Sequence, residues 1–225
     1  MMFLSCITCL TFAEMVGYYD FNHQMDDELI VDRIGGNDAT IPNGGVFLPS
    51  KAGSNNIGFG NAVFFGSPGS HAIIDSCDLF SFGRDDFTIS GWIKIPNVGS
   101  CSSGSYGMII YAGIGNQGGI NLWIGPCHRT TRGKLGFDVK GTNSLHPEAN
   151  LTLTSDNRID DNEWHWFATI VENEAMYMYI DGVEQFASGF PVYEADTLAT
   201  PPVEHICSLG DNLLSGMIDD LRIYN

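Results

Sequence analysis

Hydrophobic and polar residues alternate with a period of two along much of the chain. The clearest example is residues 87–95, where every second position from Phe87 to Ile95 is apolar or glycine and the positions between include Thr88 and Lys94. A period of two places successive side chains on opposite faces of a β-strand. The same alternation predicts strands in segments 120–124, 135–140, 176–180 and 217–224.

Turn-forming residues separate these segments, and no helix is predicted. Asp181-Gly182 directly follows segment 176–180 and is a signal for a tight hairpin. No long stretch keeps apolar positions at helical spacing between capping signals. About ten short strands joined by turns predict an all-β fold, a sandwich of two packed antiparallel sheets. A chain of 225 residues fits one such sandwich.

The charge balance narrows the classes of partner. The chain has 27 acidic and 10 basic residues, a formal net charge of -17. Nucleic acid and anionic membrane surfaces attract basic proteins, so both are poor candidate partners. No apolar run is long enough to span a bilayer, so membrane insertion is not expected. Clustered carboxylates can instead hold calcium, although the same charge can serve solubility alone.

The N-terminal segment resembles a leader sequence. Residues 1–13 form a short apolar run that ends in Ala13 and precedes the acidic Glu14. Such a run is typical of a signal peptide, so we expect cleavage after Ala13 and a secreted domain of residues 14–225. Asn150-Leu151-Thr152 is a sequon for N-linked glycosylation at Asn150, which fits a secreted protein.

The cysteines beyond the leader allow a disulfide framework. They are Cys77, Cys101, Cys127 and Cys207. Four cysteines allow three pairings. Cys101 and Cys127 flank a predicted pair of strands, so a disulfide between them would tie the ends of that pair together. Cys77 with Cys207 then follows by elimination. The alternative is buried free thiols in a cytosolic protein.

The order of the segments resembles a known family. The most specific match is Phe87-Thr88-Ile89-Ser90-Gly91-Trp92-Ile93-Lys94. The other matching segments are 18–21, 32–40, 61–66, 163–168, 178–182 and 216–225. Together they resemble the laminin-G-like domains of the concanavalin A-like lectin/glucanase superfamily. The resemblance implies a jelly-roll sandwich that serves as a lectin, an adhesion module or a hydrolase, since the fold hosts all three.

A calcium site follows from the resemblance. Members of that family often hold one calcium ion between the early Asp, Gly, Asn turn and the closing strand. The resemblance implies Asp32, Asn37 and Asp219 as the ligands here, together with backbone carbonyl groups. The ion would be structural and would hold the two ends of the domain together.

Asp219 is also unusual by its position in the pattern. It shares the alternation of Leu221 and Ile223, so its side chain should point toward the core. A buried carboxylate is costly unless it is hydrogen-bonded, paired with a cation or bound to a metal. The alternative to calcium is therefore a hydrogen-bonded Asp219 or an ion pair with Arg33 or Arg222.

Some aromatic and polar residues fall out of phase with the apolar positions of their strands. They are Trp92, Tyr111, Asn121 and Trp123. On an outer face, flat rings suit the C–H faces of sugars, and amides bind hydroxyl groups. Asp211 and Asn212, which follow Gly210, would add polar contacts at the sheet rim. The alternative is that another layer covers this face and its aromatic residues are ordinary core, as we expect for Trp164 and Trp166.

The sequence lacks the catalytic patterns of the resembled fold. Its glucanases carry E-x-D-x-x-E on one strand, and this pattern does not occur here. The pairs Asp85-Asp86 and Asp219-Asp220 are adjacent residues, so their side chains should point to opposite faces of a strand. We therefore expect a secreted, carbohydrate-recognising, lectin-like domain without enzymatic activity. The alternatives are an extracellular adhesion or matrix module that binds protein, and a glycoside hydrolase.

Overall fold

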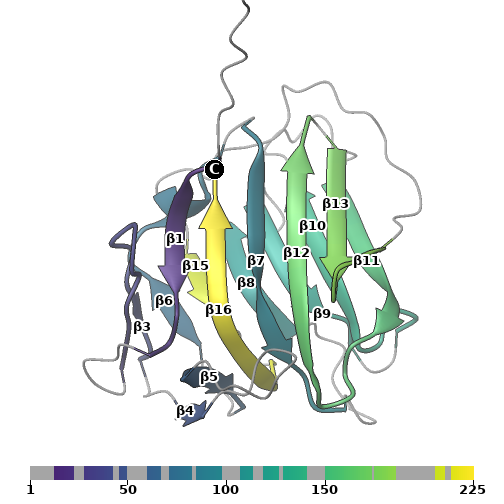
Figure 1. Cartoon of the computed structure of the whole chain (residues 1–225), viewed down its shortest axis with the longest axis horizontal. Coiled ribbons are helices and arrows are strands. Elements are labelled where there is room, and N and C mark those ends of the chain that lie inside the picture. The colour runs from purple at the N-terminus through teal and green to yellow at the C-terminus, as the bar shows by residue number, and fades with distance from the viewer. Residues whose placement is uncertain are drawn as a thin grey trace, which may run out of the picture.

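The computed structural model contains two antiparallel β-sheets packed face to face, with sheet A in front of sheet B in Figure 1. This confirms the predicted all-β sandwich. Sheet A consists of β1 (Met15–Tyr19), β4 (Val46–Pro49), β5 (Asn61–Phe65), β7 (Phe87–Lys94), β12 (Trp164–Glu172), β13 (Ala175–Ile180), β14 (Val183–Gln185) and β16 (Gly216–Tyr224). Sheet B consists of β2 (Leu29–Ile30), β3 (Ala39–Thr40), β6 (Ala72–Ile74), β8 (Gly107–Gly113), β9 (Gly119–Ile124), β10 (Lys134–Lys140), β11 (Asn150–Arg158) and β15 (Ile206–Leu209). A short 3-10 helix, η1 (Cys77–Phe80), precedes β7.

The structure describes most but not all of the chain. The described residues are 13–22, 28–42, 46–49, 60–66, 71–82, 85–97, 107–113, 119–126, 129–140, 150–173, 175–185, 206–210 and 214–225. The leader residues 1–12 and the predicted rim residues Asp211 and Asn212 lie outside these ranges, as do both cysteines of the predicted Cys101–Cys127 pair. The side chain of Asn150 is also outside the described part.

The order of the strands brings the two ends of the domain together. Sheet A has the order β14-β13-β12-β7-β16-β5-β4, with β1 also paired to β16, and sheet B has the order β11-β10-β9-β8-β15-β6-β3-β2. The backbone N–H of Glu14 donates to the carbonyl of Asn225 at 2.8 Å, and the N–H of Asn225 donates to the carbonyl of Glu14 at 2.9 Å. The first and last described strands therefore lie side by side (Figure 1).

The core lies between the sheets and follows the predicted alternation. In β7, Phe87, Ile89 and Ile93 are buried, whereas Trp92 is half-buried on the opposite face. Phe137 of β10 meets Phe87 edge to face across the sandwich, with ring centroids 6.3 Å apart. Burying one such side chain fully contributes about 1.5–3 kcal/mol, so the core stabilises the pairing of the two sheets.

A disulfide joins η1 to sheet B. The sulfur atoms of Cys77 and Cys207 are bonded at 2.11 Å, and the two residues are 130 positions apart in the chain. This is the pair that elimination predicted. Because Cys207 lies in β15, the bond fixes η1 against the middle of sheet B.

A β-bulge in β16 corrects the predicted orientation of Asp219. The register of β16 against β7 shifts between Asp219 and Arg222, where Asp220 has a φ of 50°. An extra residue breaks the alternation along a strand. Asp219 lies directly opposite Trp92, so it shares the outer face of sheet A rather than the core side of Leu221. Asp219 is nevertheless buried, at 1% exposed.

Candidate ligand-binding face

The outer face of sheet B, the side turned away from the core, carries a row of residues that crosses the strands. Each residue lies directly opposite the next in the register, from β3 through β6, β15, β8, β9 and β10 to β11. We call it the transverse row, and it consists of Thr40, Ile73, Ser208, Tyr111, Asn121, Asp138 and Thr152. From β3 to β10, the neighbours of these residues along the strands belong to the core, so the row faces outward.

Asn121 forms the most deeply buried point of the transverse row. It is 3% exposed, whereas Tyr111 and Asp138 on either side of it are half-buried. The Oδ1 atom of Asn121 has no hydrogen-bond donor among the residues that the structure describes. Side chains directly opposite one another lie about 5 Å apart, so these three form one compact group. The structure thus brings the predicted residues Tyr111 and Asn121 together.

Asp138 completes this group, although the sequence analysis did not single it out. It lies between the buried residues Phe137 and Val139, so its outward position follows from the alternation alone. A carboxylate on the outward side of a strand is ordinary. Only the register of β10 against β9, which places Asp138 opposite Asn121, distinguishes it.

Trp123 faces the same side but is not an exposed platform. It is 5% exposed and lies opposite Gly136. A Cβ atom added to Gly136 would lie 2.1 Å from the indole ring, so the ring rests directly on this glycine. This arrangement corrects the prediction of an accessible Trp123 and agrees with the alternative in which the ring is packed.

Trp92 belongs to the other sheet and does not join this group. On the outer face of sheet A it lies opposite Trp166 on one side and Asp219 on the other. Trp166 and Trp164 are half-buried on that face, so the expectation that both belong to the core is wrong. The alternation identified Trp92 as outward but could not tell which sheet carries it.

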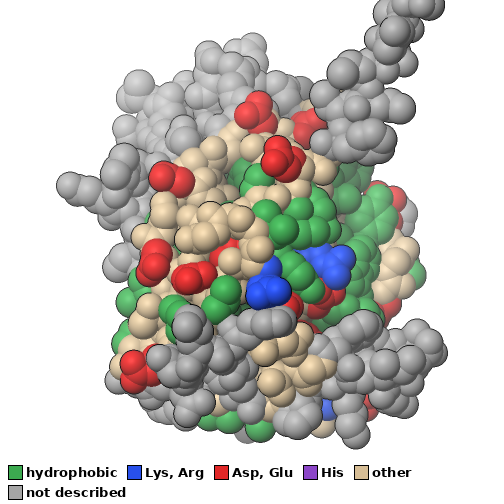
Figure 2. Space-filling model, turned by 60° about the vertical axis from the view of Figure 1, so that its left-hand side comes forward, with side chains coloured by type: hydrophobic (Ala, Val, Ile, Leu, Met, Phe, Trp, Pro, Cys, Tyr) green, Lys and Arg blue, Asp and Glu red, His purple; other side chains and the backbone are tan. Residues whose placement is uncertain are grey.

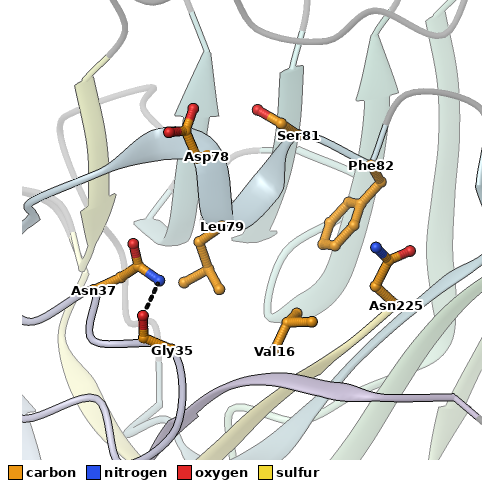
Figure 3. Close-up of a pocket in the computed structure, with 8 residues that line it drawn as sticks. All are labelled: Val16, Gly35, Asn37, Asp78, Leu79, Ser81, Phe82 and Asn225. Carbon is orange, nitrogen blue, oxygen red and sulfur yellow. Dashed lines mark hydrogen bonds between the residues drawn. The ribbon is translucent and has the colours of Figure 1, made fainter.

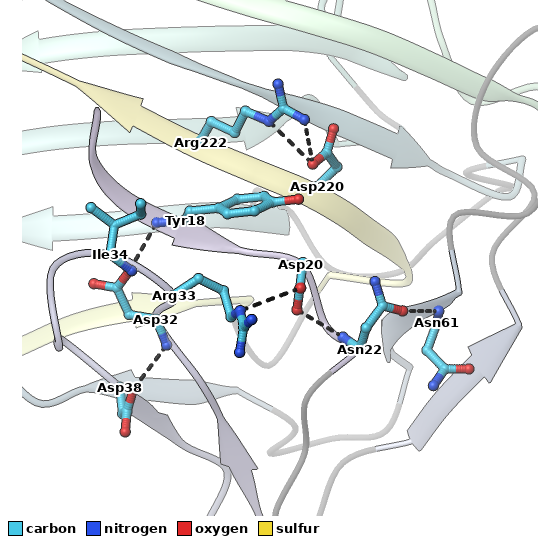
Figure 4. Close-up of polar contacts among 10 residues, drawn as sticks. All are labelled: Tyr18, Asp20, Asn22, Asp32, Arg33, Ile34, Asp38, Asn61, Asp220 and Arg222. Carbon is cyan, nitrogen blue, oxygen red and sulfur yellow. Dashed lines mark hydrogen bonds and ion pairs between the residues drawn. The ribbon is translucent and has the colours of Figure 1, made fainter. Parts of the chain in front are cut away.

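The carboxylate of Asp32 organises the turn that follows β2 (Figure 4). Its Oδ1 atom accepts hydrogen bonds from the backbone N–H groups of Tyr18 and Ile34, at 2.9 and 3.1 Å. Its Oδ2 atom accepts one from the N–H of Asn37 at 3.1 Å. Hydrogen bonds to a charged acceptor are worth about 1.5–3 kcal/mol each, so the backbone holds Asp32 firmly in place.

The three residues predicted to bind calcium come from two parts of the fold, with Asp32 and Asn37 in one turn and Asp219 on β16. Tyr19 pairs with Asp32 on one side of β1 and with Leu221 of β16 on the other. Because neighbouring strands lie about 4.8 Å apart, the backbones of Asp32 and Leu221 are about 10 Å apart with β1 between them, and Asp219 lies two residues further along β16. Carboxylate side chains on backbones this far apart can still reach one calcium ion, so the spacing does not contradict the set Asp32, Asn37 and Asp219. Calcium stays a prediction from the resemblance alone.

Both arginines named in the sequence analysis contact carboxylates close to them in the fold. Arg33 Nε lies 3.6 Å from Asp20 Oδ2, and Arg222 Nη2 lies 3.0 Å from Asp220 Oδ1. The Arg222 guanidinium also lies over the ring of Tyr18, 5.3 Å from its centroid. On the face shown in Figure 2, basic side chains lie close together with acidic side chains against them. The positive charges of Arg33 and Arg222 are thus balanced by the carboxylates of Asp20 and Asp220.

His165 bridges two turns at one end of sheet A. Its Nδ1 atom lies 2.7 Å from Asp181 Oδ2, and its Nε2 atom lies 3.1 Å from Asp161 Oδ1. Burial alone would lower the pKa of His165, but the hydrogen bonds and charges of the two carboxylates outweigh it, so this pKa is raised. Sequence reasoning missed this cluster, because Asp181 comes from a separate turn 16 residues after His165.

A small cavity of about 230 Å³ lies between β1 and η1 (Figure 3). Val16, Leu79 and Phe82 form its apolar part, and Asp78 is at its edge. The Nδ2 group of Asn37, also at the edge, donates to the carbonyl of Gly35 at 3.3 Å. Because the cavity lacks a second feature that points to a ligand, we assign none to it.

The described residues hold no group of three or more histidine, cysteine, aspartate or glutamate side chains that could bind a metal ion. Within the same residues, no helix is long and apolar enough to cross a membrane. The expectation that the domain is not an enzyme stays a prediction.

Comparison with known proteins supports the fold. A sequence profile described as the concanavalin A-like lectin/glucanases superfamily, of the laminin G type, matches residues 65–225. The comparison with curated protein sequences gives no match. The profile covers β7, β12 and β16, where the sequence pattern was clearest.

Solved structures share the same arrangement of strands. The binding domain of Paraclostridial Mosquitocidal Protein 1 has a TM-score of 0.64 at 16% identity, over 93% of this chain and 48% of that one. Domain 4 of AbnA, a GH43 extracellular arabinanase from Geobacillus stearothermophilus, in complex with arabinotriose, has a TM-score of 0.55 at 19% identity, over 95% and 93%. The binding domain of Botulinum neurotoxin DC in complex with SialylT has a TM-score of 0.54 at 14% identity, over 93% and 47%. The chain spans about half the length of the two toxin binding domains, and these similarities show the fold alone.

Proposed function

Since the chain belongs to the concanavalin A-like lectin/glucanases superfamily, we propose that it is a carbohydrate-binding domain and that the transverse row of sheet B binds the sugar. The similar arabinanase domain is in complex with arabinotriose, and a similar toxin domain is in complex with SialylT. Those ligands belong to those proteins, and they support the class of ligand proposed here rather than its identity.

The observation that carries this proposal is the buried Oδ1 atom of Asn121. A buried acceptor without a donor costs about 1–3 kcal/mol, so a donor that gains access to this atom is bound favourably. A sugar hydroxyl is such a donor. Tyr111, directly opposite and half-buried, offers a ring edge or face to the C–H groups of the same sugar. An aromatic ring beside an amide suits a sugar, because the ring packs on C–H groups and the amide bonds a hydroxyl.

A protein partner is less well supported by the surface. The exposed large apolar side chains of the described residues include Ile34 in a turn, Val46 and Leu48 on β4, Ile73 on β6 and Val183 on β14. Because these side chains are spread over four separate elements, the described residues offer less support for a protein-docking patch.

Binding without catalysis is the expected activity. Retaining glycoside hydrolysis needs two carboxyl groups about 5 Å apart. On the transverse row, the positions on either side of Asp138 are Asn121 and Thr152, which carry no charge. The row therefore supplies one carboxylate where hydrolysis would need two.

We also propose that the domain works outside the cell. The disulfide between Cys77 and Cys207 supports this location, because such bonds persist in oxidising compartments. The apolar segment 1–13 is in keeping with export.

The test is a glycan array followed by calorimetry on each hit. Asn121→Ala should weaken binding about tenfold or more, because it removes the acceptor, while the protein stays folded. Asn157→Ala, the same change at an exposed position of β11, is the control and should bind like the wild type. Equal binding by Asn121→Ala, or an array without any hit, would overturn the proposal.

A further inference from the structure

Five aromatic side chains gather on the outer face of sheet A, on the opposite side of the sandwich from the transverse row. They come from three neighbouring strands, β7, β12 and β13. We call this set the aromatic face, and it consists of Trp92, Trp164, Trp166, Tyr177 and Tyr179. Each of the five is half-buried, so part of every side chain is accessible to a ligand.

The register of the strands places these side chains on one surface. Trp166 of β12 lies directly opposite Trp92 of β7. Ala168, two residues further along β12, lies directly opposite Tyr179 of β13. Residues two apart along a strand point to the same side, and the two remaining members of the set are each two residues from Trp166 or Tyr179. The five side chains therefore form one continuous face.

The hydrophobic core lies on the other side of the same strands. Ile93, Phe167 and Met178, which alternate with members of the aromatic face, are each 0% exposed. Sheet A is the front layer in Figure 1, and none of the described strands lies in front of β7 and β12 there. Half-buried aromatic rings on this side thus do not serve the packing of the two sheets.

The size of the aromatic face favours a small ligand over a protein. It extends about 20 Å along β12 and about 10 Å across the three strands, an area of about 200 Å². Toward β16 it is bordered by ionisable residues, namely Lys94, Asp219 and Arg222. A stable protein interface buries about 800 Å² on each partner. A second copy of this chain would also bring its own formal net charge of -17 and be repelled.

The chemistry of the aromatic face suits an uncharged sugar chain. Flat rings pack against the C–H faces of sugars, and several rings in a row can hold several sugar units. Two half-buried polar residues of β7, Thr88 and Lys94, lie on the same side and can bond hydroxyl groups. The negative net charge of the chain disfavours acidic polysaccharides.

We infer that the aromatic face is a second carbohydrate-binding surface, which takes an extended, uncharged oligosaccharide along β12. It is separate from the transverse row, because the two lie on opposite sides of the sandwich. Either surface can therefore bind a glycan without the other.

The experiment compares neutral hexasaccharides with disaccharides of the same sugars, taken from arabinan, cellulose and chitin, by calorimetry. A hexasaccharide that binds should do so about tenfold or more tightly than its disaccharide, because the longer chain reaches several rings. Three of the four tryptophans of the chain belong to the aromatic face. The bound hexasaccharide should therefore protect the tryptophan fluorescence from quenching by acrylamide.

Variants on both sides of the sandwich assign the binding to one face. Trp166→Ala removes a central ring and should weaken hexasaccharide binding about tenfold or more, whereas Trp166→Phe keeps a ring and should restore most of it. Tyr179→Ala tests the neighbouring strand independently, so the test does not depend on one variant that could fail to fold. Val183→Ala removes an apolar side chain that is 62% exposed on β14, outside the set, and should bind like the wild type. Asn121→Ala should leave the fluorescence protection intact.

Each outcome decides the inference. It fails if Trp166→Ala and Tyr179→Ala bind hexasaccharides as the wild type does, or if bound glycan leaves the fluorescence unprotected, and binding that is lost only in Asn121→Ala would then belong to the transverse row. A wild type that sediments as a dimer beside a monomeric Trp166→Ala would assign the aromatic face to a second copy of the chain. If no glycan of any length binds, the proposed function and this inference both fail.

Discussion

His165 and Asp181 lie 2.7 Å apart, Nδ1 to Oδ2, at the point where β12 meets the β13–β14 hairpin. The other carboxylate oxygen of Asp181 accepts a hydrogen bond from the backbone N–H of Trp166 at 2.9 Å. One aspartate thus fixes both the backbone of β12 and the imidazole of His165. Asp161 holds the second ring nitrogen, so the ring joins the turn before β12 to the hairpin after β13.

This bridge should make stability depend on pH. The pKa of His165 is raised above its value of about 6.5 in the unfolded chain. A raised pKa in the folded state means that the stabilisation is complete below the unfolded pKa and is lost as the pH rises through the folded one. We expect about 0.5–1 kcal/mol, because both carboxylates are largely exposed and screened.

Melting temperatures of the wild type and of His165→Gln, measured from about pH 5 to pH 9, test this expectation. The wild type should be more stable than His165→Gln at acidic pH. The difference in melting temperature between the two proteins should shrink as the pH rises. Asp181→Asn should reduce the same difference, because it removes one of the two charges that favour the imidazolium. A difference that does not change with pH would show that His165 acts only through packing.

Asp32 should be essential for stability. A chelator, in contrast, should leave the melting temperature of the wild type unchanged. Asp32→Ala leaves the N–H groups of Tyr18, Ile34 and Asn37 without their common acceptor and should cost about 2–4 kcal/mol of unfolding free energy. Asp32→Asn keeps the shape and one acceptor oxygen and should cost less. If EDTA lowers the melting temperature of the wild type but not that of Asp32→Ala, a cation is bound at this turn and our interpretation is wrong.

The Cys77–Cys207 disulfide should contribute substantially to stability. The two residues are 130 positions apart, so the bond removes much of the freedom of the unfolded chain. Replacing both cysteines with alanine should cost about 2–5 kcal/mol, as measured by denaturant unfolding. Peptide mapping of the oxidised protein gives an independent check, since a different partner for Cys207 would contradict the structure.

The sequence predicted the fold far better than the site, and single residues show why. Alternation placed Phe87 and Ile89 in the core because it depends only on neighbours along one strand. The alternation failed at Asp219, because a β-bulge adds a residue between Asp219 and Arg222. A regular period of two along the sequence does not show such an added residue. It also could not pair Asn121 with Asp138, since that relationship depends on the register between two strands.

The contact between Trp123 and Gly136 gives the sharpest test of which residues on the outer face of sheet B are packing. The indole rests where a Cβ atom of residue 136 would be, 2.1 Å from the ring, so Gly136→Ala must displace the ring. We expect a loss of about 1–3 kcal/mol of unfolding free energy and a change in tryptophan fluorescence.

Trp123→Ala removes the packed ring itself and should cost about 3–5 kcal/mol. This cost distinguishes it from Asn121→Ala, whose effect should fall on glycan binding. Because both residues lie on the same strand and face, the pair of variants separates structure from recognition within β9. A Trp123→Ala protein that unfolds like the wild type but no longer binds glycan would make Trp123 a contact residue, and the ring would have to leave Gly136 to reach the sugar.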